Sequence, residues 1–272
     1  MNYFNAEKTR DNLVNWIKDW FDKNGPDCKA VIGISGGKDS TIIAALCTRA
    51  LGKDRVLGVL MPNDIQKDIS DSIRVCKSLD IPYIGINIKD YYDSLSELTL
   101  EALNSYDGKI RELSEQTKIN IAPRLRMATL YAVSQTVGGR VVNTSNLSEF
   151  ITGYFTRWGD ECGDMKPLIN LTKNEVVAIG LTMPEIPRDL VEKAPSDGLT
   201  GKTDEDKIGF SYDWLDRWIR ADYLPNGEED MPKDVYNKIL ARIDTVAFKR
   251  RGLDQFIGKN MFFTPEQEFK EN

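Results

Sequence analysis

The 272-residue sequence contains no histidine. Histidine is the commonest general base of enzymes and a common zinc ligand, so its absence excludes histidine-based catalytic triads and most zinc sites. Any chemistry must therefore depend on carboxylates, lysine, arginine, hydroxyl groups, backbone dipoles or a hard metal ion.

Paired cysteines and long hydrophobic runs are also missing. The four cysteines form neither a CxxC pair nor the closely spaced framework of a small secreted protein. The segment 1–21 carries charges throughout and lacks the apolar core of a signal peptide, and no other run approaches the length of a membrane span. We expect a cytoplasmic protein with reduced thiols and no membrane partner.

Positive charge is not in excess either. The formal net charge is −6 and the sequence pI is near 5.0, so a broad basic surface for nucleic acid is not indicated and a small-molecule partner is favoured. With 41% hydrophobic residues and no internal repeat, the chain is expected to form one domain over residues 1–272.

Short apolar runs alternate with amphipathic stretches along the first half of the chain. The predicted strands are 30–34, 55–61, 82–88 and 139–143, and the predicted helices are 5–22, 41–51, 65–79, 91–105, 121–137 and 235–249. This alternation is typical of an α/β fold with a doubly wound parallel sheet flanked by helices. Glycine, proline and charge rise over 153–167 and 192–206, which we predict to be long loops.

The string GISGGKDS at residues 33–40 follows the first predicted strand and opens the next helix. Gly36 and Gly37 can adopt positive φ, which lets backbone N–H groups face an anion. Ser35 and Ser40 offer hydroxyl groups, and the dipole of the following helix favours negative charge. The pattern therefore predicts a phosphate-binding turn.

This turn is not a Walker A loop, which would need glycine in place of Ile32 and a hydroxyl residue in place of Asp39. It resembles instead the PP-loop of the N-type ATP pyrophosphatases, a superfamily that cleaves ATP between its α and β phosphates. The resemblance implies an adenine nucleotide alpha hydrolase-like, Rossmann-like fold. It also gives Asp39 a role in holding Mg²⁺ on the phosphates.

Later segments resemble one family within that superfamily, the ammonia-dependent NAD synthetases. The matching strings are NTSNLSE at 143–149, GYFTRWGD at 153–160, LTK at 171–173, KAPS at 193–196 and KRR at 249–251. The resemblance implies ATP-dependent amidation of deamido-NAD with ammonia, through an adenylated carboxylate, to give NAD, AMP and pyrophosphate as the last step of NAD biosynthesis. It further implies a homodimer, and no glutaminase domain within these residues.

Carried over residue by residue, the resemblance assigns side chains to ATP, to deamido-NAD and to Mg²⁺. The ATP group is Gly33, Ile34, Ser35, Gly36, Gly37, Lys38, Asp39, Ser40, Met61, Thr144, Lys173 and Ser196. The deamido-NAD group is Arg124, Arg157, Asp164, Phe248 and Lys249, and the Mg²⁺ ligands are Asp39 and Glu149. The expected catalytic residues are Asp39, Lys173 and Asp164. With no histidine available, a carboxylate is expected to take the surplus proton from ammonia; the sequence does not identify that base, and Asp164 is the candidate.

Three positions depart from the family pattern. Phe248 stands where histidine is common, so an aromatic contact must replace a polar one there. Arg157 stands in place of lysine, and Ser196 in place of threonine. The last two keep charge and hydroxyl respectively, although arginine changes the geometry of an ion pair.

Two other interpretations stay open from the sequence. A PP-loop enzyme that modifies tRNA would need a basic RNA surface and often has paired cysteines, and neither is visible. A nucleotide-binding protein without turnover would not need both Asp39 and Glu149.

Overall fold

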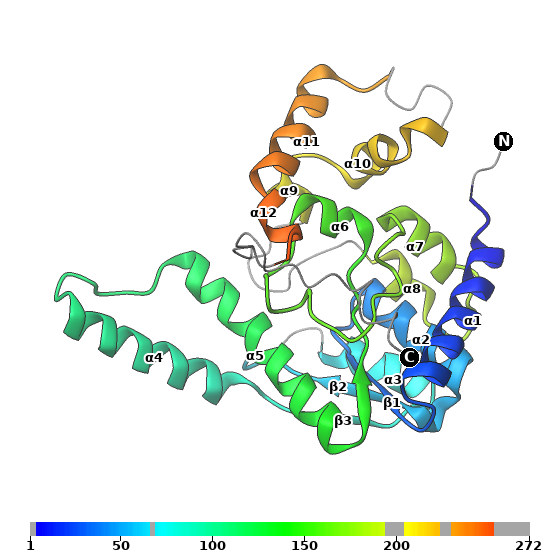
Figure 1. Ribbon diagram of the computed structural model, residues 1–272, viewed down its shortest axis with the longest axis horizontal. Coiled ribbons are helices and arrows are strands. Elements are labelled where there is room, and N and C mark those ends of the chain that lie inside the picture. The colour runs from blue at the N-terminus through cyan, green and yellow to red at the C-terminus, as the bar shows by residue number, and fades with distance from the viewer. Residues whose placement is uncertain (1–3, 66–68, 194–203, 224–229, 253–272) are drawn as a thin grey trace, which may run out of the picture.

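A computed structural model describes residues 4–65, 69–193, 204–223 and 230–252 of the chain. In this part of the chain, the strands β1 (Lys29–Gly33), β2 (Val56–Leu60), β3 (Tyr83–Gly85) and β4 (Gly139–Val141) form one sheet. All pairs are parallel and the order is β3-β2-β1-β4 (Figure 1). The predicted α/β fold with a parallel sheet is confirmed.

Helices cover both faces of the sheet because side chains along a strand point alternately to opposite sides. On β1, Ala30 and Ile32 join a hydrophobic cluster with α1 (Ala6–Asn24), α2 (Lys38–Leu51) and α3 (Ile69–Ser78). Val31, between them, joins a second cluster that packs against α5 (Glu115–Thr136). The two cores together fix the sheet between its helical layers.

Several element boundaries differ from those expected. Helix α2 begins at Lys38 instead of residue 41, because the residues that follow Gly37 already belong to its first turn. Strand β3 is shorter than predicted and exposed, as befits the edge of the sheet. The single helix predicted over 235–249 is divided at Val246 into α11 (Lys233–Thr245) and α12 (Ala247–Arg250).

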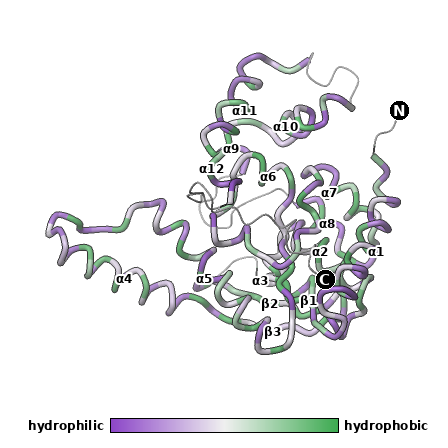
Figure 2. Tube along the Cα trace, viewed as in Figure 1, coloured by the Kyte–Doolittle hydropathy of each residue, from purple (hydrophilic) through white to green (hydrophobic). Residues whose placement is uncertain are grey.

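Helix α4 (Lys89–Tyr106) and the N-terminal part of α5 form an arm that extends away from the rest of the fold in Figure 1. No residue of α4 is buried, although apolar and polar residues alternate along it (Figure 2). Its exposed apolar side chains are Tyr91, Leu95, Leu98, Leu103 and Tyr106. Among the described helices, none combines the length and the apolar character that a membrane crossing needs.

A group of short helices follows the sheet and carries a core of its own. It contains α9 (Asp204–Ile208), α10 (Tyr212–Ile219) and α11, and the buried side chains of this core include Leu215, Ile239 and, between α9 and α10, Phe210. Helix α10 packs on α6 (Leu147–Thr152) and α7 (Lys173–Gly180), as Figure 1 shows. These two short helices were not predicted.

The remaining short elements are the helix α8 (Arg188–Glu192) and the 3-10 turns Lys53–Arg55 and Ala221–Tyr223. The predicted loop 153–167 contains no helix, and it contributes an isolated parallel bridge between Val142 and Met165. Residues 194–203 of the second predicted loop, 192–206, lie outside the described residues, and the prediction is wrong at 204–206, where α9 begins.

Candidate active site

The turn at residues 33–40 connects β1 to α2 at the carboxyl end of the sheet, where open α/β sheets bind their ligands. Gly36 has φ 79°, in the left-handed region, as the sequence predicted. Gly37 instead has φ −81° and ψ 162°, because it is the extended residue that caps α2. One glycine therefore supplies the positive φ of this turn.

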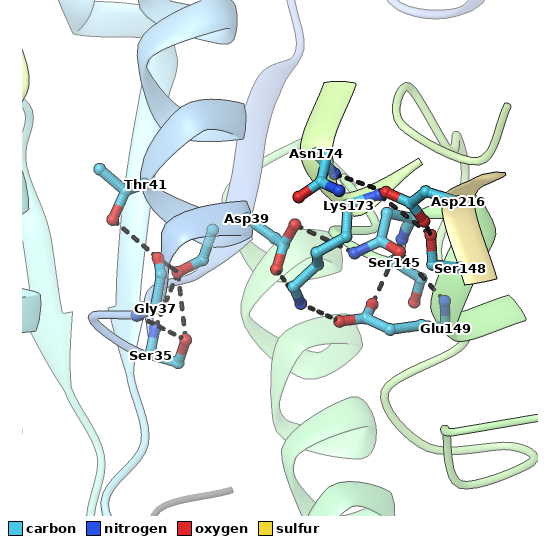
Figure 3. Close-up of polar contacts among 12 residues, drawn as sticks. Ser35, Gly37, Asp39, Thr41, Ser145, Ser148, Glu149, Lys173, Asn174 and Asp216 are labelled. Atoms are coloured by element: carbon cyan, nitrogen blue, oxygen red, sulfur yellow. Dashed lines mark hydrogen bonds and ion pairs between the residues drawn. The ribbon is translucent and has the colours of Figure 1, made fainter. Parts of the chain in front are cut away.

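Hydroxyl groups hold the turn closed. Gly37 N–H donates to Ser35 Oγ at 3.2 Å, and Ser35 Oγ lies 3.1 Å from Ser40 Oγ (Figure 3). Ser40 Oγ donates to the carbonyl of Gly37 at 3.0 Å. No side chain among the described residues caps the first turn of α2, so its N–H groups and dipole are available to an anion.

Lys173 joins two carboxylates that are distant in the sequence. Its ammonium group lies 3.0 Å from Asp39 Oδ2 and 2.7 Å from Glu149 Oε1 (Figure 3). The Lys173 side chain is only 5% exposed, and the carboxylates are 16% and 18% exposed. The structure thus brings together three residues assigned to the site from the sequence, on α2, α6 and α7.

Burial and neighbouring charges shift the pKa values of Glu149, Lys173 and the nearby Lys38. Burial, together with the negative charge of Asp39, raises the pKa of Glu149 to about 7 against the lowering effect of Lys173. Burial by itself would lower the pKa of Lys173, but the two carboxylates raise it well above its ordinary value. Burial and the nearby charge of Lys173 lower the pKa of Lys38.

Capping boxes at the starts of α6 and α7 fix the positions of Glu149 and Lys173. Asn146 caps α6: its side chain accepts a hydrogen bond from Glu149 N–H at 3.0 Å, while Glu149 Oε2 accepts from Asn146 N–H at 3.3 Å. Asn146 also donates through Nδ2 to Asp39 Oδ1 at 3.1 Å. Thr172 caps α7 in the same way, so that Lys173 is the first residue of that helix.

Sequence reasoning missed Asn146 and Tyr212 as site residues. The capping pattern NLSE at 146–149 was a usable signal for the first, since it places the asparagine beside a carboxylate already assigned to the site. No local signal pointed to Tyr212, whose ring centroid lies 5.2 Å from Lys173 Nζ. Tyr212 comes from α10, and only packing brings it there.

Other residues assigned to ATP lie along the same edge of the sheet. Met61 directly follows β2, and its carbonyl accepts a hydrogen bond from Arg126 Nε at 3.0 Å. A Cβ added at Gly33 would lie 3.3 Å from Met61 Cε, so the start of the turn and this side chain are in close contact. Thr144 follows β4 and is half-buried. Ser196 lies outside the described residues.

Most residues assigned to the dinucleotide gather around the loop that begins at Gly153. Arg124 Nε donates to the carbonyl of Arg157 at 3.4 Å, and the Arg157 guanidinium lies 5.0 Å from the ring centroid of Trp158. Lys249 Nζ donates to the carbonyl of Gly153 at 2.5 Å and also to that of Phe155. Phe248, beside it, is 55% exposed. This face therefore presents cations and aromatic rings together.

Asp164 bonds to the backbone of β4 and, among the described residues, not to the loop around Gly153. Its Oδ2 accepts a hydrogen bond from Val141 N–H at 2.7 Å, and its own N–H donates to the Val141 carbonyl at 2.8 Å. In the described part of the chain, Asp164 shares no hydrogen bond or ion pair with Asp39, Glu149 or Lys173. The structure does not bring this residue into the charged cluster.

The carboxylates of Asp39 and Glu149 are suitable ligands for Mg²⁺. They are hard oxygen donors that already converge on one cation, the Lys173 ammonium. Mg²⁺ is typically bound through one or two carboxylates together with substrate phosphates. The described residues hold no larger metal-binding cluster of His, Cys, Asp or Glu, so phosphates and water would complete the coordination.

Comparison with known proteins identifies the family. The family model described as NAD synthase matches residues 9–252. The chain is 42% identical to the NH3-dependent NAD⁺ synthetase of Pyrococcus furiosus over 84% of each chain. It is 44% identical to that of Pyrococcus horikoshii, over 83% of this chain and 84% of the other.

Solved structures agree with this assignment. NMN synthetase from Francisella tularensis is similar with a TM-score of 0.78 and 30% identity, over 93% of this chain and 98% of that chain. The NH3-dependent NAD synthetase from Campylobacter jejuni, solved with a nitrate ion, gives a TM-score of 0.73 and 25% identity, over 93% and 100% of the two chains. The prediction from the PP-loop and the later strings is confirmed: the chain belongs to the NAD synthase family and is an enzyme of the ligase class.

Proposed function

We propose that this enzyme amidates deamido-NAD with ammonia, consuming ATP and forming NAD, AMP and pyrophosphate. The observation that carries the proposal is the placement of Asp39, Lys173 and Glu149 beside an anion-binding turn at the end of β1. The relatives that are 42% and 44% identical are named NH3-dependent NAD⁺ synthetases, which supports the choice of product and nitrogen donor.

In the first step, an oxygen of the nicotinate carboxylate attacks the α-phosphorus of ATP. The bond from that phosphorus to the bridging oxygen breaks, pyrophosphate leaves, and an acyl adenylate remains. The N–H groups at the start of α2, with Lys38 and Lys173, would neutralise the charge that develops on pyrophosphate. Mg²⁺ held by Asp39 and Glu149 would supply further charge neutralisation on the phosphates.

In the second step, ammonia attacks the activated carbonyl, AMP leaves with the electron pair of the broken bond, and a base takes the surplus proton. We assign this role to Asp164, the carboxylate expected from the sequence. Asp164→Asn is a suitable test because the amide oxygen can still accept from Val141 N–H, while the basic group is lost. Loss of kcat at an unchanged melting temperature would support this role, whereas an unchanged kcat would remove Asp164 from the mechanism.

The cation-rich face around the loop at Gly153 suits a dinucleotide. Arg124, Arg157 and Lys249 offer positive charge for a second phosphate group, and the exposed Phe248 and Trp158 offer rings for stacking. A mononucleotide would leave part of this face unused. Since a similar solved structure is named NMN synthetase, the deamidated mononucleotide is the competing substrate to test.

We also propose that the enzyme is a cytoplasmic homodimer, as expected from the sequence. The apolar side chains on α4 support a second copy of the chain as partner, because exposed apolar faces of this kind mark interfaces. Sedimentation at several concentrations would test this, with Leu98→Glu on the exposed face as the variant expected to yield monomers.

The deciding experiment measures AMP and amide product from ATP, Mg²⁺ and either deamido-NAD or the deamidated mononucleotide. Ammonium or glutamine is the nitrogen source, and Asp39→Asn is the matched variant. We expect NAD from deamido-NAD with ammonium alone, and its loss in the variant. If the enzyme prefers the deamidated mononucleotide, that compound is its substrate in place of deamido-NAD. Pyrophosphate release only with tRNA would favour the RNA-modifying enzyme. No turnover with either deamidated nucleotide would refute the proposal.

A further inference from the structure

Helix α10 belongs to the C-terminal helices, and two of its side chains, Tyr212 and Asp216, lie where it packs on α6 and α7. Tyr212 covers the Lys173 ammonium with its ring, 5.2 Å from the centroid. Asp216 lies on the same face of α10, since residues four apart share a helix face, and it is buried to 7% exposure. Asp216 contacts none of the three charged residues through its side chain, and its effect must be indirect.

The Asp216 carboxylate receives hydrogen bonds from both α6 and α7. Ser148 Oγ donates to Asp216 Oδ1 at 2.6 Å, and Asn174 N–H donates to Asp216 Oδ2 at 2.9 Å (Figure 3). Ser148 Oγ in turn accepts the Lys173 N–H at 3.0 Å. One buried carboxylate thereby satisfies, directly or through Ser148, the first two N–H groups of α7, which have no partner within that helix.

The residues held in this way flank the charged cluster. Ser148 directly precedes Glu149 on α6, and Asn174 directly follows Lys173 on α7. A displacement of either helix end would move the Glu149 carboxylate or the Lys173 ammonium away from Asp39. Hydrogen-bonded partners behind the groups that touch ligand or metal commonly fix those groups in place, and their removal is costly to affinity and rate.

We propose that Asp216 is a positioning residue for the reaction, which holds Glu149 and Lys173 in register with Asp39 through Ser148 and the backbone of α7. The inference rests on the proposed function for its kinetic part. Its structural part requires only that Glu149 and Lys173 depend on Asp216 for their placement. Through Asp216, α10 then contributes to the placement of two groups of the charged cluster.

Asp213 offers a matched control on the same helix. It accepts a hydrogen bond from Asn174 Nδ2 at 2.9 Å, but its side chain is exposed and its partner is a side chain instead of the helix backbone. Asp213→Ala therefore removes a contact between α10 and α7 of the same length without touching the bonds to Ser148 and the α7 backbone. Asp216→Ala removes both of those bonds.

The test compares wild type with Asp216→Ala, Ser148→Ala and Asp213→Ala. The readouts are kcat and KM for ATP, the affinity of the ATP-bound protein for Mn²⁺ measured by electron paramagnetic resonance, and the melting temperature. We expect Asp216→Ala and Ser148→Ala each to lower kcat and Mn²⁺ affinity by about 10-fold to 100-fold, since they loosen groups behind the metal ligands. KM for ATP should change by less than threefold, and Asp213→Ala should match wild type on every readout.

The double variant of Ser148 and Asp216 sharpens the result, because its loss should equal that of one single variant when both act through the same chain of hydrogen bonds. If Asp216→Ala does not fold, Ser148→Ala decides alone. The proposal is wrong if the folded variants keep kcat and Mn²⁺ affinity, or if neither variant folds, since the network would then serve folding only. An inactive wild type would refute the proposed function, and the Mn²⁺ measurement would still decide the role of Asp216.

Discussion

The ammonium group of Lys173 lies 3.0 Å from Asp39 Oδ2, although 134 residues separate the two in the sequence. The same group lies 2.7 Å from Glu149 Oε1. Lys173 therefore holds two carboxylates together at a point where like charges would otherwise repel, and where Mg²⁺ and phosphates are proposed to bind.

Replacing Lys173 by methionine should damage both stability and activity. The change keeps the aliphatic chain but leaves Asp39 and Glu149 mostly buried without their cation, at a cost of about 3 to 5 kcal/mol to the free energy of unfolding. Pyrophosphate release should fall by about 100-fold or more, because a charge that stabilises the leaving group is lost. Urea denaturation and steady-state kinetics measure the two effects.

Lys53→Met is the control for this variant. Lys53 also pairs with an aspartate, Asp80, but both side chains are largely exposed. Surface ion pairs contribute little to stability, so this variant should unfold like wild type and keep full activity. Equal effects of the two substitutions would contradict the role assigned to Lys173.

Gly36→Ala should weaken ATP binding more than Gly37→Ala. Gly36 has φ 79°, where an L-residue costs about 1 to 2 kcal/mol, so the turn must either store this strain or change shape. Gly37 has φ −81° and ψ 162°, which alanine adopts freely, and the new Cβ would meet only Ser35 Oγ at 3.2 Å. Isothermal titration of ATP into both variants provides the comparison, and equal affinities would show that the positive φ is not needed for binding.

Tyr212→Phe and Tyr212→Leu should behave differently. The Tyr212 hydroxyl is buried and finds no hydrogen-bond partner among the described residues, so its removal should leave stability equal or slightly higher. Leucine also removes the ring that covers Lys173, which loses a cation–π contact of about 2 kcal/mol in a desolvated site. Thermal unfolding and kcat for the pair of variants separate the hydroxyl from the ring.

Alkaline pH should destabilise the protein through Cys47. Burial raises the pKa of this thiol from 9.0 to about 12, so above pH 9 the unfolded chain loses a proton that the folded chain keeps. The unfolded state then binds fewer protons, and the free energy of unfolding falls as pH rises from 9 towards 12. Between pH 8 and pH 10 wild type should lose about 1.4 kcal/mol more than Cys47→Ala, as measured by urea denaturation. Equal losses in the two proteins would contradict this account.

The parts of the fold that repeat a local pattern could be predicted from the sequence. Each of the four strands was located, because buried parallel strands are short apolar runs between helical stretches. Helices α6 and α7 were missed since they are short and begin in capping boxes within a polar region. The break at Val246 was missed because the apolar spacing continues through it.

The sequence by itself determined the strand, turn and helix around residues 33–40, since the positive φ of Gly36 and the hydroxyl groups of Ser35 and Ser40 act within a few bonds of one another. Family resemblance, read from strings along the chain, named Asp39, Glu149 and Lys173 one at a time. Only the tertiary structure decided that the three share one ion-paired cluster, that Asp164 bonds to the β4 backbone outside this cluster, and that Asp216 bonds to both α6 and α7. These contacts join residues on different elements, and their distances depend on how the helices pack on the sheet, which no local pattern specifies.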